Sequence, residues 1–422
     1  MVQLPKPTIS RLANGMRYMY VHMPHSNFVY TSLLGTAGRR AEHWDEIGSA
    51  HFLEHLFFGG TERFPSPVLL NDRVDELGVR RGGSTSPEYV SYWSRALPEH
   101  LEIAADFVSD IFLHSRLTDE DIAREQGVIG TEVRWNKDQP SRYIAYLLRQ
   151  LSLPDQIVGT TILDEESRLK DKNHDSLVAF RARLYGKENF MAVVAGPIPE
   201  SEARQVAETY YGTDEYASVD RVTFDSPVFR TEKAFHHEVR QVDQAHLGIW
   251  WEGFARDNDM SPACTILGLI LGNKQNSRLG KILRLERNIV YETPRFENNS
   301  RHDHGFLGLY LRLKDESDLQ ESYETALAQI LLIAEEGVTE AEVATAKAIH
   351  KSNFIFNREG MVEVVSDLAT DHIWTDTPLS LEQQLARTQT VTAAQVQDAA
   401  RHILGQEPKV VAISKNAGTL TI

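Results

Sequence analysis

Two histidines and a glutamate in one short segment have the residue types and the spacing that can hold a metal ion. His51 and His55 are four residues apart, and Glu54 stands between them. On a helix, positions i and i+4 lie on the same face, so the two imidazoles could bind one Zn²⁺. A catalytic zinc site is tetrahedral and leaves one position for water. Glu54 lies on the flank of that face and could accept a proton from the water.

The same pattern also has a purely structural interpretation. The residues around the motif are apolar, so we expect this helix to be buried (Phe52, Leu53, Leu56, Phe57 and Phe58). Buried polar groups cost free energy unless they are paired, and two histidines satisfied by a neighbouring glutamate would meet that need. A third metal ligand from elsewhere in the chain would decide between the two interpretations.

A second helix is predicted over residues 118–135, because Thr-Asp-Glu-Asp at its start is typical of a helix N-cap. Glu125 and Glu132 are seven residues apart and therefore lie on one face of it. Gly127 and Gly130 each cost about 1 kcal/mol relative to alanine in a helix, and we expect them to permit close approach of another helix. A glutamate that faces the two histidines would complete a His₂Glu site.

Length and composition indicate an ordinary globular protein with more than one domain. The single cysteine, Cys264, lies in an apolar run, which excludes an intrachain disulfide and favours a place in the core. No signal peptide is recognisable at the N-terminus, and no apolar run approaches the ~20 residues of a membrane span, so we expect a cytoplasmic protein. The net charge of −16 argues against nucleic acid and membranes as partners and would attract cationic ligands.

Strand and helix patterns alternate along the first half of the chain. Asn14-Gly15 predicts a hairpin turn within residues 8–23. The remaining segments are predicted from periodicity and from their flanking glycine and proline residues: strands at 27–34, 89–93 and 190–194, and helices at 68–77, 98–114, 175–184 and 200–210. Polar residues near 212–225 are typical of a linker.

Beyond this linker, sequence features of the first half recur. Gly186 and Gly405 each end a similar helix that a strand follows, and they are 219 residues apart. The N-cap segments 117–122 and 338–343 match at an offset of 221. The sequence therefore predicts two copies of one α+β unit, at 1–215 and 226–422. Asn353 occupies the place of Glu132 in the second copy, so we expect only the first copy to hold metal.

These motifs together resemble the M16 (pitrilysin-like, inverzincin) zinc metallopeptidase family, and especially its short M16B-type chains, such as the subunits of mitochondrial processing peptidase. In that family, a glutamate ligand follows H-x-x-E-H at a spacing that the 76 residues between His55 and Glu132 reproduce. The segment 57–61, Phe-Phe-Gly-Gly-Thr, resembles the family's F-x-G-T ending of the metal helix. The resemblance extends over nearly the whole chain.

The resemblance implies a role for each polar residue of the first copy. His51, His55 and Glu132 would be the ligands of one Zn²⁺ per chain. Glu54 would be the general base that acts on the metal-activated water. Glu125 would be a carboxylate that orients a histidine ligand.

Substrate contacts are implied by the same resemblance. Arg284 and Tyr291, in the second copy, match the family's S-R-L…R…Y element, which polarises the substrate carbonyl. Ser84 and Thr85 would belong to a substrate-docking edge strand. The family's N-A-x-T-S segment reads Gly-Gly-Ser-Thr-Ser at residues 82–86, which departs from the pattern at the asparagine.

The fold implied is α+β, with two homologous α+β units, each an antiparallel sheet packed with helices, forming half of a clamshell chamber. The function implied is a zinc-dependent endopeptidase that cleaves short unfolded peptides inside a dimeric chamber. We expect a homodimer, because one chain carries both the metal motif and the Arg/Tyr motif. A heterodimer with another M16-like chain, in which this chain is a non-catalytic or partner subunit, is the alternative.

Overall fold

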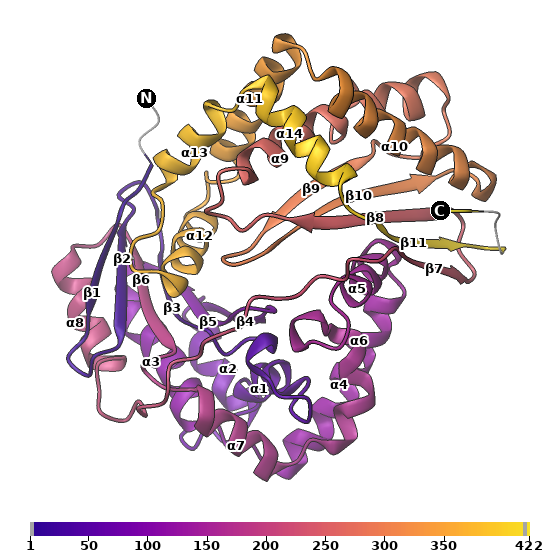
Figure 1. Ribbon diagram of the computed structural model, residues 1–422. Helices are drawn as coiled ribbons and strands as arrows, with labels where there is room; N and C mark the ends of the chain where they lie inside the picture. The colour runs from indigo at the N-terminus through magenta and orange to yellow at the C-terminus, as the bar shows by residue number, and fades with distance from the viewer. Residues whose placement is uncertain (1–3, 417–419) are drawn as a thin grey trace. The chain divides into compact units, whose positions relative to one another are not determined.

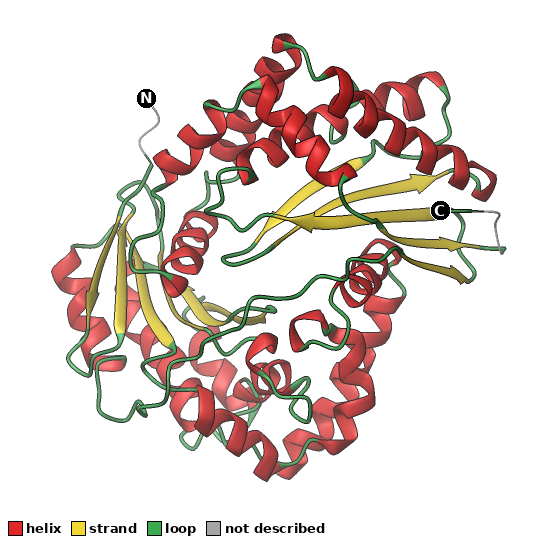
Figure 2. Ribbon diagram, in the orientation of Figure 1, coloured by secondary structure: helices red, strands yellow, loops and turns green. Residues whose placement is uncertain are grey.

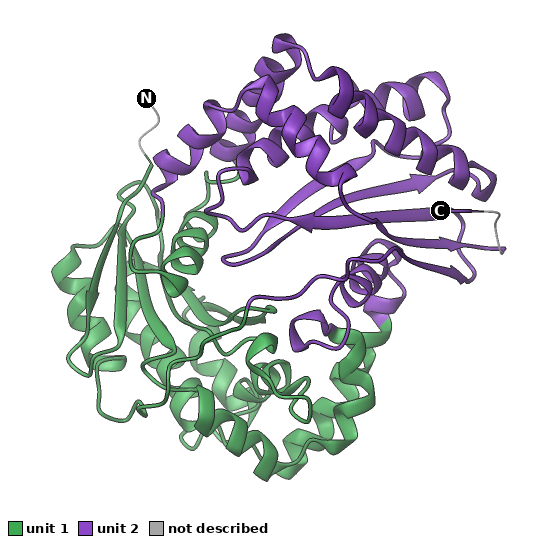
Figure 3. Cartoon of the chain, in the orientation of Figure 1, with its two compact units in different colours: residues 1–134, 162–225, 357–378 green, residues 135–161, 226–356, 379–422 purple. Residues whose placement is uncertain are grey.

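The computed structural model describes residues 4–416 and 420–422. The chain forms two compact units, and neither unit is one continuous segment (Figure 3). The first comprises residues 1–134, 162–225 and 357–378, and the second comprises 135–161, 226–356 and 379–422. Each unit combines one sheet with several helices (Figure 2).

The first unit is built on a sheet whose strands lie in the order β1-β2-β6-β3-β5-β4, which makes β4 an edge strand. Neighbouring strands are antiparallel except β2 and β6, which are parallel, so the sheet is mixed rather than purely antiparallel. The strands are β1 (Pro7–Arg11), β2 (Arg17–His22), β3 (Val29–Gly35), β4 (Arg80–Thr85), β5 (Val90–Ala96) and β6 (Phe190–Gly196).

Local sequence accounts for the predicted hairpin between β1 and β2. Gly15 has a positive φ of 90°, which glycine adopts without steric cost. The Asn14 side chain accepts a hydrogen bond from the Met16 amide at 2.9 Å, which closes the turn. The two strands pair in antiparallel register, so the hairpin prediction is confirmed.

Helices cover this sheet, with α3 against β3 and β5, α8 against β2 and β6, and α12 against β3 and β6. Figure 1 shows α8 and α12 beside the sheet of the first unit. The helices of this unit are α1 (Ser49–Phe57), α2 (Pro67–Asp75), α3 (Leu101–His114), α4 (Asp119–Lys137, whose last turn belongs to the second unit), α6 (Ile162–Glu165), α7 (His174–Leu184), α8 (Glu200–Tyr210) and α12 (Met361–Trp374).

The second unit repeats this design. Its strands lie in the order β7-β11-β8-β10-β9, which reproduces β2-β6-β3-β5-β4, and β7 and β11 form the one parallel pair, as β2 and β6 do. The predicted two copies of one α+β unit are therefore present. The strands are β7 (Ala234–Val239), β8 (Ala245–Gly253), β9 (Arg295–Ser300), β10 (Gly305–Leu313) and β11 (Lys409–Ser414).

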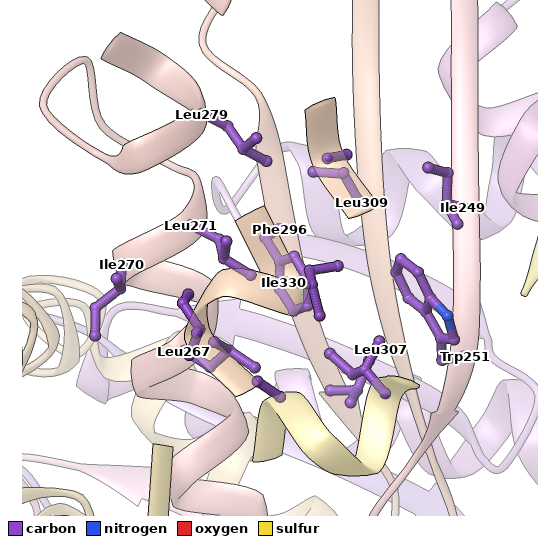
Figure 4. Packing of buried hydrophobic residues seen from close by; sticks show 14 of the residues in the cluster. Ile249, Trp251, Leu267, Ile270, Leu271, Leu279, Phe296, Leu307, Leu309 and Ile330 are labelled. Atoms are coloured by element: carbon purple, nitrogen blue, oxygen red, sulfur yellow. The ribbon is translucent and has the colours of Figure 1, made fainter. Parts of the chain in front are cut away.

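The core of the second unit lies between its sheet and its helices. Leu267 and Ile330, from helices, pack with Leu307 and Trp251 from the sheet (Figure 4). Cys264 is fully buried in this core, as expected, and burial raises the pKa of its thiol to about 12. The helices are α5 (Pro140–Ser152), α9 (Ser261–Leu271), α10 (Leu319–Glu336), α11 (Glu340–Phe356), α13 (Leu381–Gln389) and α14 (Ala393–Leu404).

Each copy contributes one helix to the compact unit of the other copy. Helix α5, which no sequence pattern predicted, follows α4 in the chain but packs on β8 and β11 of the second unit. Its residues Ile144 and Leu148 are buried against Val411 and Ile413. Helix α12 of the second copy packs in the first unit. The compact units therefore differ from the continuous segments 1–215 and 226–422, whose boundaries as repeats stay a prediction.

Across the part of the chain that the structure describes, none of the helices combines the length and the apolar character that crossing a membrane would require.

Candidate metal centre

The helix that carries H-x-x-E-H is fixed at its N-terminus by a buried carboxylate. Gly48, in the left-handed conformation with φ of 87°, precedes the first turn and has no side chain to cap it. Glu42 accepts hydrogen bonds from the amides of Gly48 and Ala50 at 3.0 and 2.8 Å, so it satisfies amide groups that the helix leaves free. The Lys172 ammonium donates to the Ser49 hydroxyl at 2.9 Å. These contacts position α1.

Helices α1 and α4 bring three potential ligand atoms together. The Nε2 atoms of His51 and His55 lie 3.3 Å apart. The Oε2 atom of Glu132 lies 3.4 Å from the first and 3.6 Å from the second. In a tetrahedron with metal–ligand bonds of about 2.0–2.1 Å, ligand atoms are about 3.3–3.4 Å apart. The three residues therefore fit one zinc ion.

The Nδ1 atom of each histidine lies within hydrogen-bond distance of a carboxylate. The Nδ1 atom of His55 lies 3.0 Å from Glu125, the residue that the resemblance assigned to this place. The Nδ1 atom of His51 lies 2.7 Å from Glu165, a residue that no sequence pattern indicated. A carboxylate that accepts the Nδ1 proton leaves Nε2 to face the metal, and it fixes the plane of the ring.

Glu165 is itself held in place. Its carboxylate is 1% exposed and accepts a hydrogen bond from Arg39 Nε at 2.9 Å. It ends the short helix α6, where the sequence shows several neighbouring acidic residues and no periodic pattern. The distance of 114 residues from His51 left no local signal for this contact.

The carboxylates set the protonation of the histidines. Burial lowers the pKa of His51, but hydrogen bonds to Glu132 and Glu165 outweigh burial and raise it to about 10. Burial likewise lowers the pKa of His55, and Glu125 and Glu132 raise it to about 9. The two histidines in turn lower the pKa of Glu132. In the absence of metal, the site therefore holds protons that a cation must replace.

Glu54 differs from the other carboxylates because its side chain forms no hydrogen bond or ion pair with any residue that the structure describes. It lines a cavity of about 960 Å³ together with His55 and Phe58. Gly83 of β4 lies against it: a Cβ atom there would be 2.8 Å from Glu54 Cγ. A half-buried, unpaired carboxylate beside a metal site can accept a proton from water.

The predicted docking strand lies beside the metal helix. Strand β4 contacts α1, and the Thr85 hydroxyl donates a hydrogen bond to the Ala50 carbonyl at 3.5 Å. Ser84 is exposed on the same strand. Because β4 is an edge strand, one side of its backbone has no strand partner in the sheet.

One prediction for α4 is wrong. Gly127 and Gly130 were expected to allow close approach of another helix. A Cβ atom on Gly127 would have no neighbour within 4 Å, and one on Gly130 would only make ordinary contacts at 3.5 Å with Arg134 and Leu169. The glycines lower the helix propensity of α4 without a steric reason.

Arg284 and Tyr291 belong to the second unit, whereas the metal ligands belong to the first. Arg284 lies in a π-helical segment and donates to the Thr293 hydroxyl at 3.0 Å. Tyr291 is 53% exposed, and the guanidinium of Arg312 lies 4.6 Å from the centre of its ring. The structure thus places the Arg/Tyr pair in the other repeat. It brings together the five residues predicted for the metal site: His51, Glu54, His55, Glu125 and Glu132.

Two family models match the chain and agree with this division. The model described as "Insulinase (Peptidase family M16)" matches residues 17–163, and the model described as "Peptidase M16 inactive domain" matches residues 172–349. The chain belongs to peptidase family M16.

Similar proteins match nearly the whole length of the chain. The Bacillus subtilis (strain 168) protein "Uncharacterized zinc protease YmxG" is 26% identical over 402 residues, with 95% of this chain and 96% of that protein covered. "Mitochondrial-processing peptidase subunit beta" of Rattus norvegicus is 23% identical, with 98% and 85% covered. A solved structure, "a protease from Helicobacter pylori", has a TM-score of 0.87 at 17% identity, with 97% and 100% covered, and shares the M16 fold.

Proposed function

We propose that this chain is a zinc-dependent endopeptidase that cleaves short, unfolded peptides with a metal-activated water. The observation that carries the proposal is the triangle of His51 Nε2, His55 Nε2 and Glu132 Oε2, with edges of 3.3, 3.4 and 3.6 Å, beside the unpaired carboxylate of Glu54. The names of the relatives, zinc proteases and processing-peptidase subunits, support it.

The chemistry divides between the metal and the side chains around it. Bound zinc would lower the pKa of a water molecule and polarise a carbonyl group. Glu54 accepts the proton of the attacking water and then donates it to the leaving amine. Glu165 keeps His51, and Glu125 keeps His55, in the orientation that presents Nε2 to the metal.

Substrate binding is assigned to β4 and to the second repeat. An extended peptide can add to the free edge of β4 through backbone hydrogen bonds, which a folded domain cannot offer. Donors from Arg284 and Tyr291 would stabilise the oxyanion that develops on the scissile carbonyl. This role comes from the family resemblance.

The assembly that we propose is a homodimer that encloses a chamber, each chain supplying both motifs. A heterodimer in which this chain serves as a partner subunit is the second candidate, and one observation favours it: the model that matches residues 172–349 is named for an inactive domain. The match to that model lies mostly in the second repeat, and the candidate ligands within residues 51–132 lie outside it.

A single pair of measurements tests the function. We expect the purified protein to bind about one Zn²⁺ per chain and to cleave unfolded peptides until a chelator removes the metal. Glu54→Gln should retain zinc and lose roughly 10²–10⁴-fold in kcat, because only the proton acceptor is removed. Retention of full activity without metal, or loss of zinc in Glu54→Gln, would contradict the assignment.

A further inference from the structure

The cavity beside Glu54 extends along both sides of strand β4. Successive side chains of a strand point to opposite faces, so Gly83 faces Glu54 and Phe58 while Gly82 faces the other way. Gly82 lies opposite Trp93 of β5, and a Cβ atom there would be 2.6 Å from the indole ring. The indole therefore lies against the bare backbone of β4 and forms part of the cavity wall.

Two arginines stand next to this indole. Arg80 of β4 pairs directly with Arg95 of β5 in the antiparallel register, two positions from the pair of Gly82 and Trp93. All four residues line the same cavity. Two like charges directly opposite each other on neighbouring strands are unfavourable, so this pair costs stability unless it serves another purpose.

Neither arginine has a counter-charge. Among the residues that the structure describes, no acidic group is within ion-pair distance of Arg80 or Arg95. The Nε atom of Arg95 is buried without a hydrogen-bond partner, and its guanidinium lies 4.8 Å from the centre of the Trp93 ring. Stacking on the indole holds the guanidinium in one orientation before any ligand binds.

Apart from Glu54, the other charges of the cavity wall are already paired. Arg81 donates to Asp75 at 2.5 Å, and Arg124 donates to Glu125 at 3.1 Å. Glu54 is on the Gly83 side of β4. The wall formed by Trp93, Arg95 and Arg80 therefore has two uncompensated positive charges in a protein whose net charge is −16.

We infer that this wall is a subsite for an acidic side chain, aspartate or glutamate, of the bound peptide. The inference rests on the proposed docking of a peptide strand along β4. Side chains of such a strand alternate between the Glu54 side and the Trp93 side, so the preference acts on a residue that points away from the metal. A carboxylate there would bind the fork of Arg95 and relieve the repulsion from Arg80.

Peptide sets with single replacements test the subsite. Each set carries glutamate, glutamine or lysine at one position at a time around a cleaved bond, with the C-terminus amidated. At one position or at alternate positions, we expect kcat/KM for glutamate to exceed that for glutamine by about tenfold, and lysine to be the poorest. Arg80→Gln/Arg95→Gln should reduce the ratio of glutamate to glutamine below about twofold, and Arg80→Glu should favour lysine over glutamate.

Arg221→Gln is the matched control. Arg221 is exposed on the loop after α8, and Arg221→Gln removes one positive charge, as Arg80→Gln does. The ratio of glutamate to glutamine should therefore not change in this variant. A thermal melt shows whether the double variant is folded, and Arg80→Gln alone repeats the test at an exposed position. An unchanged ratio in the arginine variants would overturn the inference. A preference that appears only in companion peptides with a free C-terminal carboxylate would also overturn it.

Binding separates this inference from the proposed function. Fluorescence anisotropy of labelled glutamate and glutamine peptides is measured on Glu54→Gln protein, with and without the two arginine replacements. An arginine-dependent preference of the Glu54→Gln protein for the glutamate peptide, together with a zinc-loaded wild-type protein that cleaves no peptide, would support the subsite and refute the peptidase. Cleavage without any arginine-dependent preference would support the peptidase and refute the subsite.

Discussion

The Nδ1 atom of His51 lies 2.7 Å from a carboxylate oxygen of Glu165, and that carboxylate is almost fully buried. Glu165→Gln keeps the size of the side chain but removes the charge that fixes the imidazole, so we expect zinc affinity to fall roughly 10–100-fold. Competition with a chromophoric zinc chelator measures the change.

The matched control for this prediction is Glu202→Gln, which removes an exposed glutamate on α8 and should leave zinc affinity unchanged. Glu165→Asp retains the charge and should restore part of the affinity if positioning is the cause. Equal zinc affinity in the wild type and in Glu165→Gln would show that the contact does not support the metal site.

Protonation should make the metal-free protein and the zinc complex respond to pH in opposite directions. His51 and His55 have folded-state pKa values of about 10 and 9, above the ~6.5 of an unfolded chain. Their contribution to stability is complete below about pH 6.5 and is lost as the pH rises through the folded-state values. We therefore expect the Tm of the metal-free protein to fall between pH 6.5 and 10.

Zinc binds neutral imidazole, so its affinity should rise over the same range, and binding at pH 7 should release about two protons. Calorimetry in buffers of different ionisation enthalpy counts these protons. Zinc binding without proton release, or a metal-free protein that gains stability up to pH 9, would contradict the charged histidine pair.

Gly83→Ala tests how closely β4 constrains the proposed base. The new Cβ atom would lie 2.8 Å from Glu54 Cγ and 3.1 Å from the Phe58 ring, so the Glu54 side chain must move. We expect kcat to fall at least tenfold while the zinc content is retained. Gly127→Ala, with no atom within 4 Å of the added group, should leave kcat unchanged and raise stability by up to about 1 kcal/mol.

Mixing two inactive variants tests the proposed homodimer. The proposed base, Glu54, and the proposed oxyanion donor, Tyr291, belong to different units of the chain. If one chain supplies the metal and its partner supplies the tyrosine, a mixed dimer of Glu54→Gln and Tyr291→Phe has one site with both lesions and one intact site. Subunit exchange should then restore activity in proportion to the mixed dimer.

Activity that stays at the level of the two parents after verified exchange would show that each site uses residues of one chain. A native mass of a single chain under conditions of full activity would exclude the dimer itself. Each parent variant, exchanged with itself, is the control for the handling of the protein.

Much of the candidate metal centre could be predicted because its spacing is local. His51, Glu54 and His55 lie within two turns of one helix, and Glu125 and Glu132 lie two turns apart on another, so helical periodicity alone places each set on one face. Glu165 has no such signature. Its partner is 114 residues away, and only tertiary packing brings the two together.

The same limit applies to the fold. The hairpin of β1 and β2 could be predicted from the Asn14-Gly15 turn, because the strands are adjacent in sequence. The parallel pairing of β2 and β6 joins strands from opposite ends of the repeat. Helix α5 was missed altogether, and the strands that bury Ile144 and Leu148 belong to the second copy.

The helix exchange has a consequence for synthesis on the ribosome. Strand β6 ends at Gly196, but the α12 segment that covers it begins only at Met361. At about 5–20 residues per second, roughly 10–30 s pass between the two. During that interval the first sheet leaves apolar surface exposed in a chain whose candidate metal ligands have already been made. Early capture of zinc by the nascent chain would therefore precede completion of the first unit, and chaperones would find their binding surface on β3 and β6.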